Sequence, residues 1–73
     1  MRRTKEDSEQ TREDILNASV RIFSEKGVSQ ATLDEIAKAA NVTRGAIYWH
    51  FENKFQIFEA LHDRLHQPFV STI

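Results

Sequence analysis

Four amphipathic segments follow one another along the chain. In the first, from Ser8 to Lys26, apolar residues recur every three or four positions, as they do on one face of an α-helix. These residues are Ile15, Leu16, Ala18, Val20, Ile22 and Phe23. Gly27 follows at the place where a helix end commonly takes a left-handed residue, and Lys26 suits the negative end of the helix dipole. We therefore predict a first helix over residues 8–26.

A second, shorter segment begins at Thr32. Its hydroxyl can cap a helix whose third residue, Glu35, reaches back to the capping residue, which is the reciprocal pattern of a capping box. The inward positions of this helix are small and apolar: Leu33, Ile36, Ala37 and Ala40. Asn41 tolerates the left-handed conformation and predicts the end of the helix. One residue later Thr43 can cap a third helix over residues 43–51.

A fourth helix is predicted to begin after Asn53, with Gln56 in the capping-box position. Its apolar residues are Phe55, Ile57, Phe58, Leu61 and Leu65. Pro68 predicts that this helix ends near Gln67 or bends there, because proline has no backbone N–H to donate. The second and third helices, joined by a short turn, have the spacing of a helix-turn-helix motif. The predicted fold class is all-α: a three-helix, homeodomain-like helix-turn-helix domain plus the start of a fourth helix.

The composition narrows the possible functions. A chain of 73 residues forms one domain at most, and at this size it buries only about 60% of the surface that it exposes when unfolded, so a large cofactor cavity is not expected. The sequence has no cysteine, which excludes disulfides and thiolate metal sites. It has neither a long apolar run nor a signal-like segment. We expect a cytoplasmic protein with no cofactor and no membrane association.

The overall charge does not indicate a nucleic-acid partner, because ten basic and eleven acidic residues give a net charge of -1. The distribution of charge is more informative. Arg2, Arg3 and Lys5 lie close together, and we predict a basic flexible arm over residues 1–7. The pattern alone leaves open whether this arm is a solubilising tail.

The predicted third helix, TRGAIYWHF over residues 43–51, has an unusual outer face. Ile47 and Phe51 fall on the same side of the helix, so they should face the core. The opposite side carries Gly45, Ala46 and Trp49, with Tyr48 and His50 on the flanks and Thr43 and Arg44 at the N-terminal tip. A glycine within a helix costs about 1 kcal/mol relative to alanine. Its place on the outer face indicates that a partner approaches closely.

A DNA major groove is a partner of this kind. Arg44 can donate two hydrogen bonds to O6 and N7 of guanine, and Thr43 can reach a phosphate or a thymine methyl group. Tyr48 and His50 are placed for the phosphates that border the groove. Lys54 adds a cation beside the start of the fourth helix.

Each of these residues has an ordinary explanation when it is taken alone. Thr43 is a helix cap, Tyr48 or Trp49 is a partly buried core aromatic, and His50 is a hydrogen-bonded surface residue. Their combination after a helix and a short turn predicts DNA binding.

Residues 11–54, TREDILNASVRIFSEKGVSQATLDEIAKAANVTRGAIYWHFENK, resemble the DNA-binding domain of TetR-family repressors, and specifically the AcrR-like branch that controls multidrug efflux-pump operons. The most specific part is VTRGAIYWHFENK, with RRTKE and TLDEIAKAA in support. Asn41 stands where family members commonly have glycine. The resemblance implies a sequence-specific transcriptional repressor of an efflux-pump operon that binds double-stranded DNA. The DNA-binding positions that it implies are Thr32, Thr43, Arg44, Gly45, Tyr48, Trp49, His50 and Lys54.

The resemblance also implies a domain organisation: an arm over residues 1–7, a helix-turn-helix domain over residues 8–67 and a tail over residues 68–73. Family members carry a further helical domain that binds an effector and forms a dimer, and from its length we expect this chain to lack that domain. We expect a homodimer on a palindromic operator for a full-length relative. For this chain alone we expect a monomer or weak association.

Two alternatives remain open from the sequence. The apolar residues Phe55, Phe58 and Leu61 of the fourth helix can form a protein-interaction module. Glu59, His62 and His66 have helical spacing that can present metal ligands, although a fourth ligand is not evident. The sequence does not reveal a converging nucleophile, base and orienting group, so we do not expect an enzyme.

Overall fold

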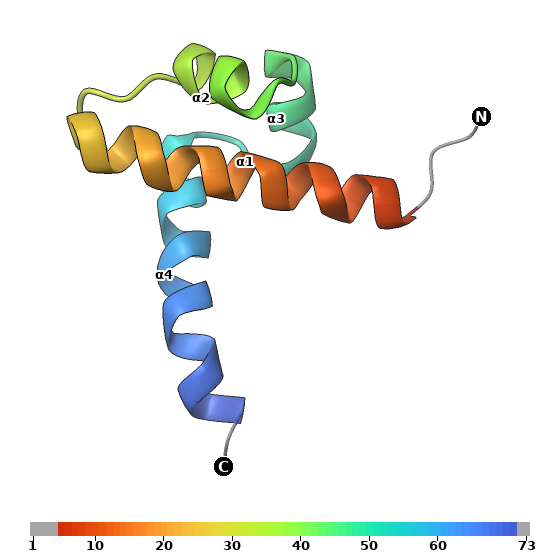
Figure 1. Cartoon of the computed structure of the whole chain (residues 1–73), viewed down its shortest axis with the longest axis vertical. Coiled ribbons are helices and arrows are strands. Elements are labelled where there is room, and N and C mark those ends of the chain that lie inside the picture. Colours follow the sequence, from red (N-terminus) through yellow and green to blue (C-terminus); the bar gives the residue numbers. More distant parts are fainter. Residues whose placement is uncertain (1–4, 72–73) are drawn as a thin grey trace.

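The computed structural model describes the backbone of residues 5–71 and the side chains of residues 8–64. This part of the chain forms four helices and no strand: α1 Lys5–Lys26, α2 Leu33–Ala40, α3 Arg44–His50 and α4 Lys54–Ser71. Helices α2 and α3 lie together on one side of α1, and α4 passes α1 and extends away on the other side (Figure 1). The predicted all-α fold with a helix-turn-helix motif is confirmed.

Helix α1 begins at Lys5, three residues earlier than the pattern of apolar residues predicted. The segment before Ser8 is polar, so it gives no periodic signal, although nothing in it prevents the helix from continuing. Part of the expected flexible arm is therefore helical. The other part, residues 1–4, lies outside the described residues.

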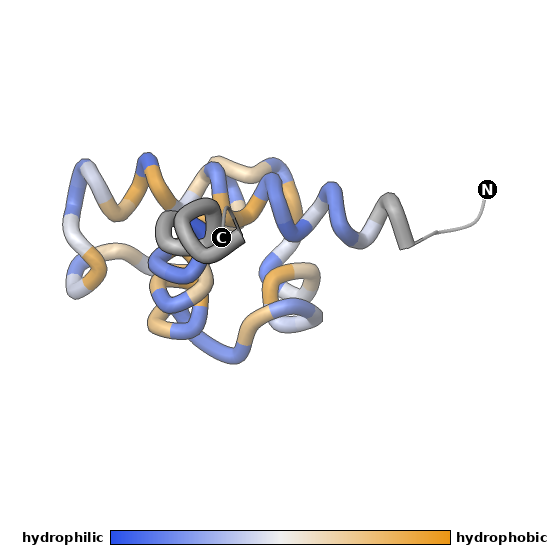
Figure 2. The backbone as a smooth tube through the Cα atoms, turned by 90° about the horizontal axis from the view of Figure 1, so that it is seen from below, coloured by the Kyte–Doolittle hydropathy of each residue, from blue (hydrophilic) through white to orange (hydrophobic). Residues whose placement is uncertain are grey.

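The core lies where α1 meets the other three helices. Its buried residues are Ile15, Leu16, Ala18, Ile22, Ala31, Ile36, Ala37, Ile47, Phe51, Ile57 and Leu61. Hydrophobic and hydrophilic segments alternate along the tube of α1 in Figure 2, as expected for a helix that buries one face.

One inward residue of α1 was predicted wrongly. Val20 is 47% exposed, whereas Ser19 is completely buried. Ser19 lies one turn after Ile15, on the same face, and its hydroxyl donates to the carbonyl of Ile15 at 2.7 Å. Because that bond satisfies the hydroxyl, a small polar residue can occupy the position that the apolar pattern assigned to its neighbour.

The predicted ends of α1 and α2 are confirmed. Gly27 has a φ of 85° and Asn41 a φ of 63°, so both adopt the left-handed conformation that ends a helix. At the start of α2, the Oγ1 atom of Thr32 accepts from the N–H of Glu35, and the carboxylate of Glu35 accepts from the N–H of Thr32. This capping box fixes the place where α2 begins.

Helix α4 begins as predicted, but one hydrogen bond at its start and the set of residues that it buries differ from the prediction. The Oδ1 atom of Asn53 accepts from the N–H of Gln56, whose own side chain accepts from Glu52 instead of Asn53. Ile57 is completely buried, whereas Phe55 and Phe58 are 59% and 47% exposed.

The predicted apolar face of α4 therefore divides into two parts. Ile57 and Leu61 are one turn apart and face α1, so Leu61 does not belong to the exposed surface that we expected. Phe58 lies beside that face and makes an edge-to-face contact with Phe23, with 6.3 Å between ring centroids. The side chain of Leu65 lies outside the described residues.

The predicted stop near Gln67 is not found, because α4 includes Pro68 and ends at Ser71. A proline removes one N–H donor from a helix. Here only three residues of the helix follow it, so a single missing hydrogen bond near the end does not break the element.

Candidate nucleic-acid interface

Helix α3 is held by its two apolar anchors and presents its other side chains outward. Ile47 is completely buried and Phe51 nearly so, as their spacing predicted. Trp49 is 80% exposed, and Gly45 and Tyr48 are exposed as well. The predicted outer face of the helix is therefore on the surface.

Two threonines cap the helices of the motif. Thr43 caps α3, where its Oγ1 atom accepts from the N–H of Ala46 at 3.1 Å, and Thr32 caps α2 in the same way. Both threonines are exposed. Because a hydroxyl that accepts one bond still carries a proton, each can donate to an external oxygen.

Gly45 is not required by the conformation of the chain. Its φ does not lie in the left-handed region, and a Cβ atom built there would meet only the Oγ1 atom of Thr43, at 3.8 Å. That is an ordinary van der Waals distance, so alanine would fit. Nothing in the described part of the chain requires a glycine at this position.

Arg44 is held between two helices. One guanidinium nitrogen donates to the Oδ1 atom of Asp34 on α2 at 3.1 Å, and the other donates to the hydroxyl of Tyr48 at 3.2 Å. These two hydrogen bonds, first that to Tyr48 and then that to Asp34, raise the pKa of Arg44. The guanidinium also lies over the Tyr48 ring, 5.7 Å from its centroid.

Asp34 was not among the predicted site residues. Ten positions separate it from Arg44, so no local spacing connects the two. The signal in the sequence for this contact was an acidic residue in the first turn of α2, followed along the chain by a helix, α3, that begins with an arginine. By itself the acidic residue is explained by the helix dipole.

Lys54 is engaged by the protein itself. Its ammonium donates to the carbonyl of Ser29 at 2.8 Å and to that of Ala31 at 2.9 Å. Both carbonyls belong to the loop before α2, and Ala31 directly precedes the Thr32 cap. An ammonium has three donors, so one remains for a phosphate. Lys54 and Thr32 are thus brought close together, in a group separate from that of Thr43, Arg44 and Tyr48.

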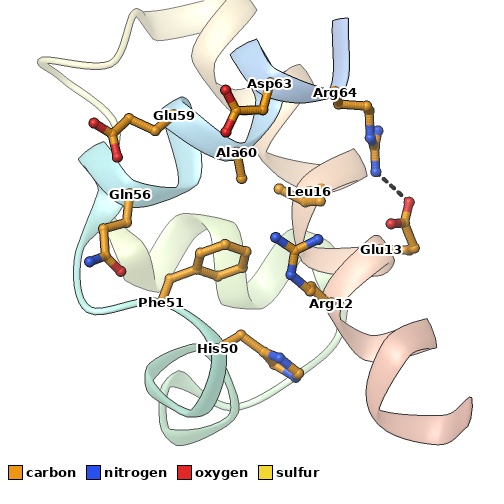
Figure 3. Close-up of a pocket in the computed structure, with 10 residues that line it drawn as sticks. All are labelled: Arg12, Glu13, Leu16, His50, Phe51, Gln56, Glu59, Ala60, Asp63 and Arg64. Carbon is orange, nitrogen blue, oxygen red and sulfur yellow. Dashed lines mark hydrogen bonds and ion pairs between the residues drawn. The ribbon is translucent and has the colours of Figure 1, made fainter. Parts of the chain in front are cut away.

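His50 lies at the far end of α3, beside an open hollow of about 520 Å³ between α1, α4 and the end of α3 (Figure 3). Burial, and then the positive charge of Arg12, lower the pKa of His50 from its ordinary value of 6.5. The imidazole is therefore mostly neutral at pH 7, and in that form it can offer a hydrogen bond.

Arg12 stacks over the Phe51 ring, 5.2 Å from its centroid, on the side where His50 lies. Across the same hollow, Arg64 of α4 pairs with Glu13 of α1 and donates to Asn17 at 3.3 Å. These contacts fix α1 against α4 and the end of α3.

The metal-site alternative gains no support from the described side chains. Among them, no group of three His, Cys, Asp or Glu residues lies close enough to hold an ion. That comparison includes Glu59 and His62, whereas the side chain of His66 lies outside it. Within the described part of the chain, no helix combines the length and apolar character needed to span a membrane.

Comparison with known proteins places this geometry in a family. Residues 15–61 match the model of the bacterial regulatory proteins of the tetR family. The chain is 52% identical over 67 residues to the transcriptional regulator TtgR of Pseudomonas putida, covering 92% of this chain and 32% of that protein. It is 54% identical over 68 residues to the transcriptional repressor BepR of Brucella suis, covering 93% of this chain and 32% of the relative.

A solved structure agrees in fold. NalD, the secondary repressor of the MexAB-OprM multidrug efflux pump in Pseudomonas aeruginosa, superimposes with a TM-score of 0.77 at 53% identity, over 80% of this chain and 29% of that one. The chain spans about a third of the length of the curated relatives that it matches. With the family model covering most of its helices, the chain belongs to the TetR family of bacterial regulatory proteins.

Proposed function

We propose that this chain is a sequence-specific DNA-binding domain that inserts α3 into the major groove and represses transcription of an efflux-pump operon. The observation that carries the proposal is the surface of α3. A helix anchored by Ile47 exposes a glycine that its own fold does not need, between a tethered arginine and an 80% exposed tryptophan. A partner that approaches the backbone closely explains all three.

The residues have distinct roles in this proposal. Arg44 reads a guanine through two N–H groups, and Gly45 admits the edge of the base pairs. The hydroxyls of Thr43 and Tyr48 donate to phosphates on either side, and the neutral His50 forms a further hydrogen bond. Such phosphate contacts position the helix without reading sequence.

In this proposal the remaining residues lie at the rim of the interface. Thr32 and Lys54 lie at adjoining helix starts and meet one phosphate from α2 and α4. Trp49 covers a sugar or base edge with its exposed ring.

The relatives support a repressor of an efflux-pump operon. BepR is a transcriptional repressor, and NalD is a repressor of a multidrug efflux pump in its own organism. These relatives are transcriptional regulators and not enzymes. For this chain we propose the same class of target, in the cytoplasm, with a palindromic operator that accommodates two copies of the domain.

A selection from a pool of randomised duplexes tests the proposal. The protein is mixed with the pool, bound duplexes are recovered and sequenced, and binding of an enriched duplex is followed by the fluorescence of Trp49, the single tryptophan. We expect enrichment of one sequence and a fluorescence change that saturates. Recovery of an unselected pool, with no preferred sequence, would contradict the proposal.

Arg44→Ala identifies the reading residue in the same assay. We expect it to weaken binding of the enriched duplex by roughly 10- to 100-fold and to relax the preference at one base pair. Arg21→Ala is the matched control, because it removes an exposed arginine that is not among the proposed contacts. If both variants bind the enriched duplex as tightly as the parent, the helix does not read DNA through Arg44.

A further inference from the structure

The arginine proposed to read DNA is not free in this structure. Its guanidinium donates to a carboxylate on a different helix and to a phenol on its own helix, so two of its five N–H groups are engaged. The side chains of Arg44 and Asp34 are 51% and 72% exposed. This is a surface contact, and such ion pairs contribute little to folding stability. Folding stability therefore gives little reason for this contact.

A carboxylate at this place opposes binding to any DNA. Asp34 lies 3.1 Å from the guanidinium that would enter the groove. In the proposed complex its negative charge would therefore lie close to the DNA, and charges separated by less than the screening length of about 8 Å still repel one another. A negative charge there repels every duplex in the same way, whatever its sequence.

The same carboxylate fixes the direction of the arginine. A free arginine reaches many phosphates and bases, because its long side chain adopts many conformations. The bonds to Asp34 and Tyr48, together with stacking over the Tyr48 ring, hold the fork in one direction and leave three N–H groups to donate. A guanidinium held in this way can donate to a guanine only at the position that α3 sets for it.

We propose that Asp34 is a specificity-determining positioning residue: it lowers the affinity of the domain for all DNA and restores affinity only for duplexes that present guanine to the tethered Arg44. This inference rests on the proposed DNA-binding function. The charge of Asp34 sets how strongly non-cognate DNA is rejected, and its hydrogen bond to Arg44 sets how sharply the cognate base is read.

Two substitutions separate these effects. Asp34→Asn removes the charge and keeps an oxygen that can accept from Arg44, whereas Asp34→Ala removes both. We expect each variant to bind a scrambled duplex roughly three- to tenfold more tightly than the parent. The ratio of affinities for the enriched and scrambled duplexes should fall about tenfold in Asp34→Ala and less in Asp34→Asn.

Glu35→Gln is the matched control. It removes one negative charge from the neighbouring position of the same helical turn, but Glu35 pairs with Lys26 and does not contact Arg44. We expect its ratio of affinities to equal that of the parent. Thermal unfolding of each variant identifies a temperature at which all of them are folded, and binding is compared there.

The outcomes distinguish the two proposals. If the parent enriches no sequence, the DNA-binding function fails and the inference fails with it. If the parent enriches a sequence whose binding requires Arg44, but Asp34→Ala keeps the parent's ratio of affinities, only the role of Asp34 is overturned. A ratio that falls equally in Glu35→Gln and Asp34→Ala would also overturn it, because the effect would then come from charge at α2 in general.

Discussion

At the scale of single residues, Gly45 shows how stability and binding can favour different side chains. In an ordinary helix alanine is preferred over glycine by about 1 kcal/mol, because glycine loses more backbone freedom on folding. The surroundings of Gly45 have room for a Cβ atom, since the nearest atom would be 3.8 Å away. The glycine therefore weakens the fold without a structural reason, as expected for a residue kept for a partner.

Gly45→Ala is expected to raise the free energy of unfolding by up to about 1 kcal/mol and to weaken DNA binding. The added methyl group points away from the core, toward the surface that would face the groove. Urea unfolding followed by circular dichroism measures the first effect, and titration with the enriched duplex measures the second.

Gly27→Ala is the control for Gly45→Ala, because the φ of Gly27 is 85° and any L side chain there is strained. That variant should lose stability while a folded sample keeps its DNA affinity. If Gly45→Ala instead loses stability, or binds DNA as tightly as the parent, our explanation of this glycine is wrong.

At the scale of elements, the starts of α2 and α4 are tied together by one side chain. Lys54 reaches from the first turn of α4 to two carbonyls of the loop that leads into α2. The sequence predicted a phosphate contact for this lysine. The structure adds a second role, since the ammonium also holds the loop from which Thr32 caps its helix.

Lys54→Met is expected to lower the free energy of unfolding by about 1 to 3 kcal/mol, because the carbonyl of Ala31 is partly buried and loses its donor. Methionine keeps the apolar part of the side chain. Chemical denaturation gives the measurement, and Lys38→Met, at an exposed lysine of α2, is the control. An unchanged stability with weaker binding to every duplex would leave phosphate contact as the single role of Lys54.

The end of α1 and the start of α2 are joined by a pH-dependent contact. The hydrogen bond from Lys26, and then that from the backbone of Thr32, lower the pKa of Glu35 from its ordinary value of 4.5. A carboxyl group whose pKa is lower in the folded state stabilises the fold above its unfolded pKa. That contribution is lost as the pH falls through the lower folded value.

Glu35→Gln should therefore flatten the loss of stability below about pH 4.5, because glutamine can still accept from the Thr32 N–H but has no charge to lose. Urea midpoints between neutral and acidic pH measure this change. Lys26→Met should flatten the curve only in part, because the hydrogen bond from the Thr32 N–H still lowers the pKa of Glu35. A curve as steep as that of the parent in both variants would show that this pair does not contribute to the acid dependence.

At the scale of the whole molecule, the net charge of -1 gives no general attraction to DNA. Affinity must therefore come from where the cations lie. Arg44 and Lys54 lie at the proposed interface, and Arg2 and Arg3 precede α1 along the chain. Each phosphate neutralised by a cation releases counterions, so the dependence of affinity on salt counts these contacts.

Arg2→Ala combined with Arg3→Ala is expected to reduce the slope of log affinity against log salt by about 2, if both arginines meet phosphates. The affinity should fall for enriched and scrambled duplexes alike, because phosphate contacts carry no sequence information. An unchanged slope would identify the basic arm as a solubilising tail.

The sequence by itself determined the local features of this protein. The Thr32 and Glu35 capping box, the left-handed Gly27 and the inward pair of α3 all depend on residues no more than four positions apart, whose hydrogen bonds and spacing act within one helix. These signals also carried the helix-turn-helix prediction. For the same reason, most of the residues proposed to meet DNA could be identified from one short segment, residues 43–51.

Tertiary structure decided which of several possible partners each side chain takes. The hydrogen bond from Arg44 to Asp34 spans ten positions, and those from Lys54 to Ser29 and Ala31 span more than twenty. Helical periodicity identifies an apolar side but not the line along which a neighbouring helix packs against it. The packing of the helices buries Ser19 instead of Val20. It also brings the carboxylate of Asp34 on α2 to Arg44 on α3.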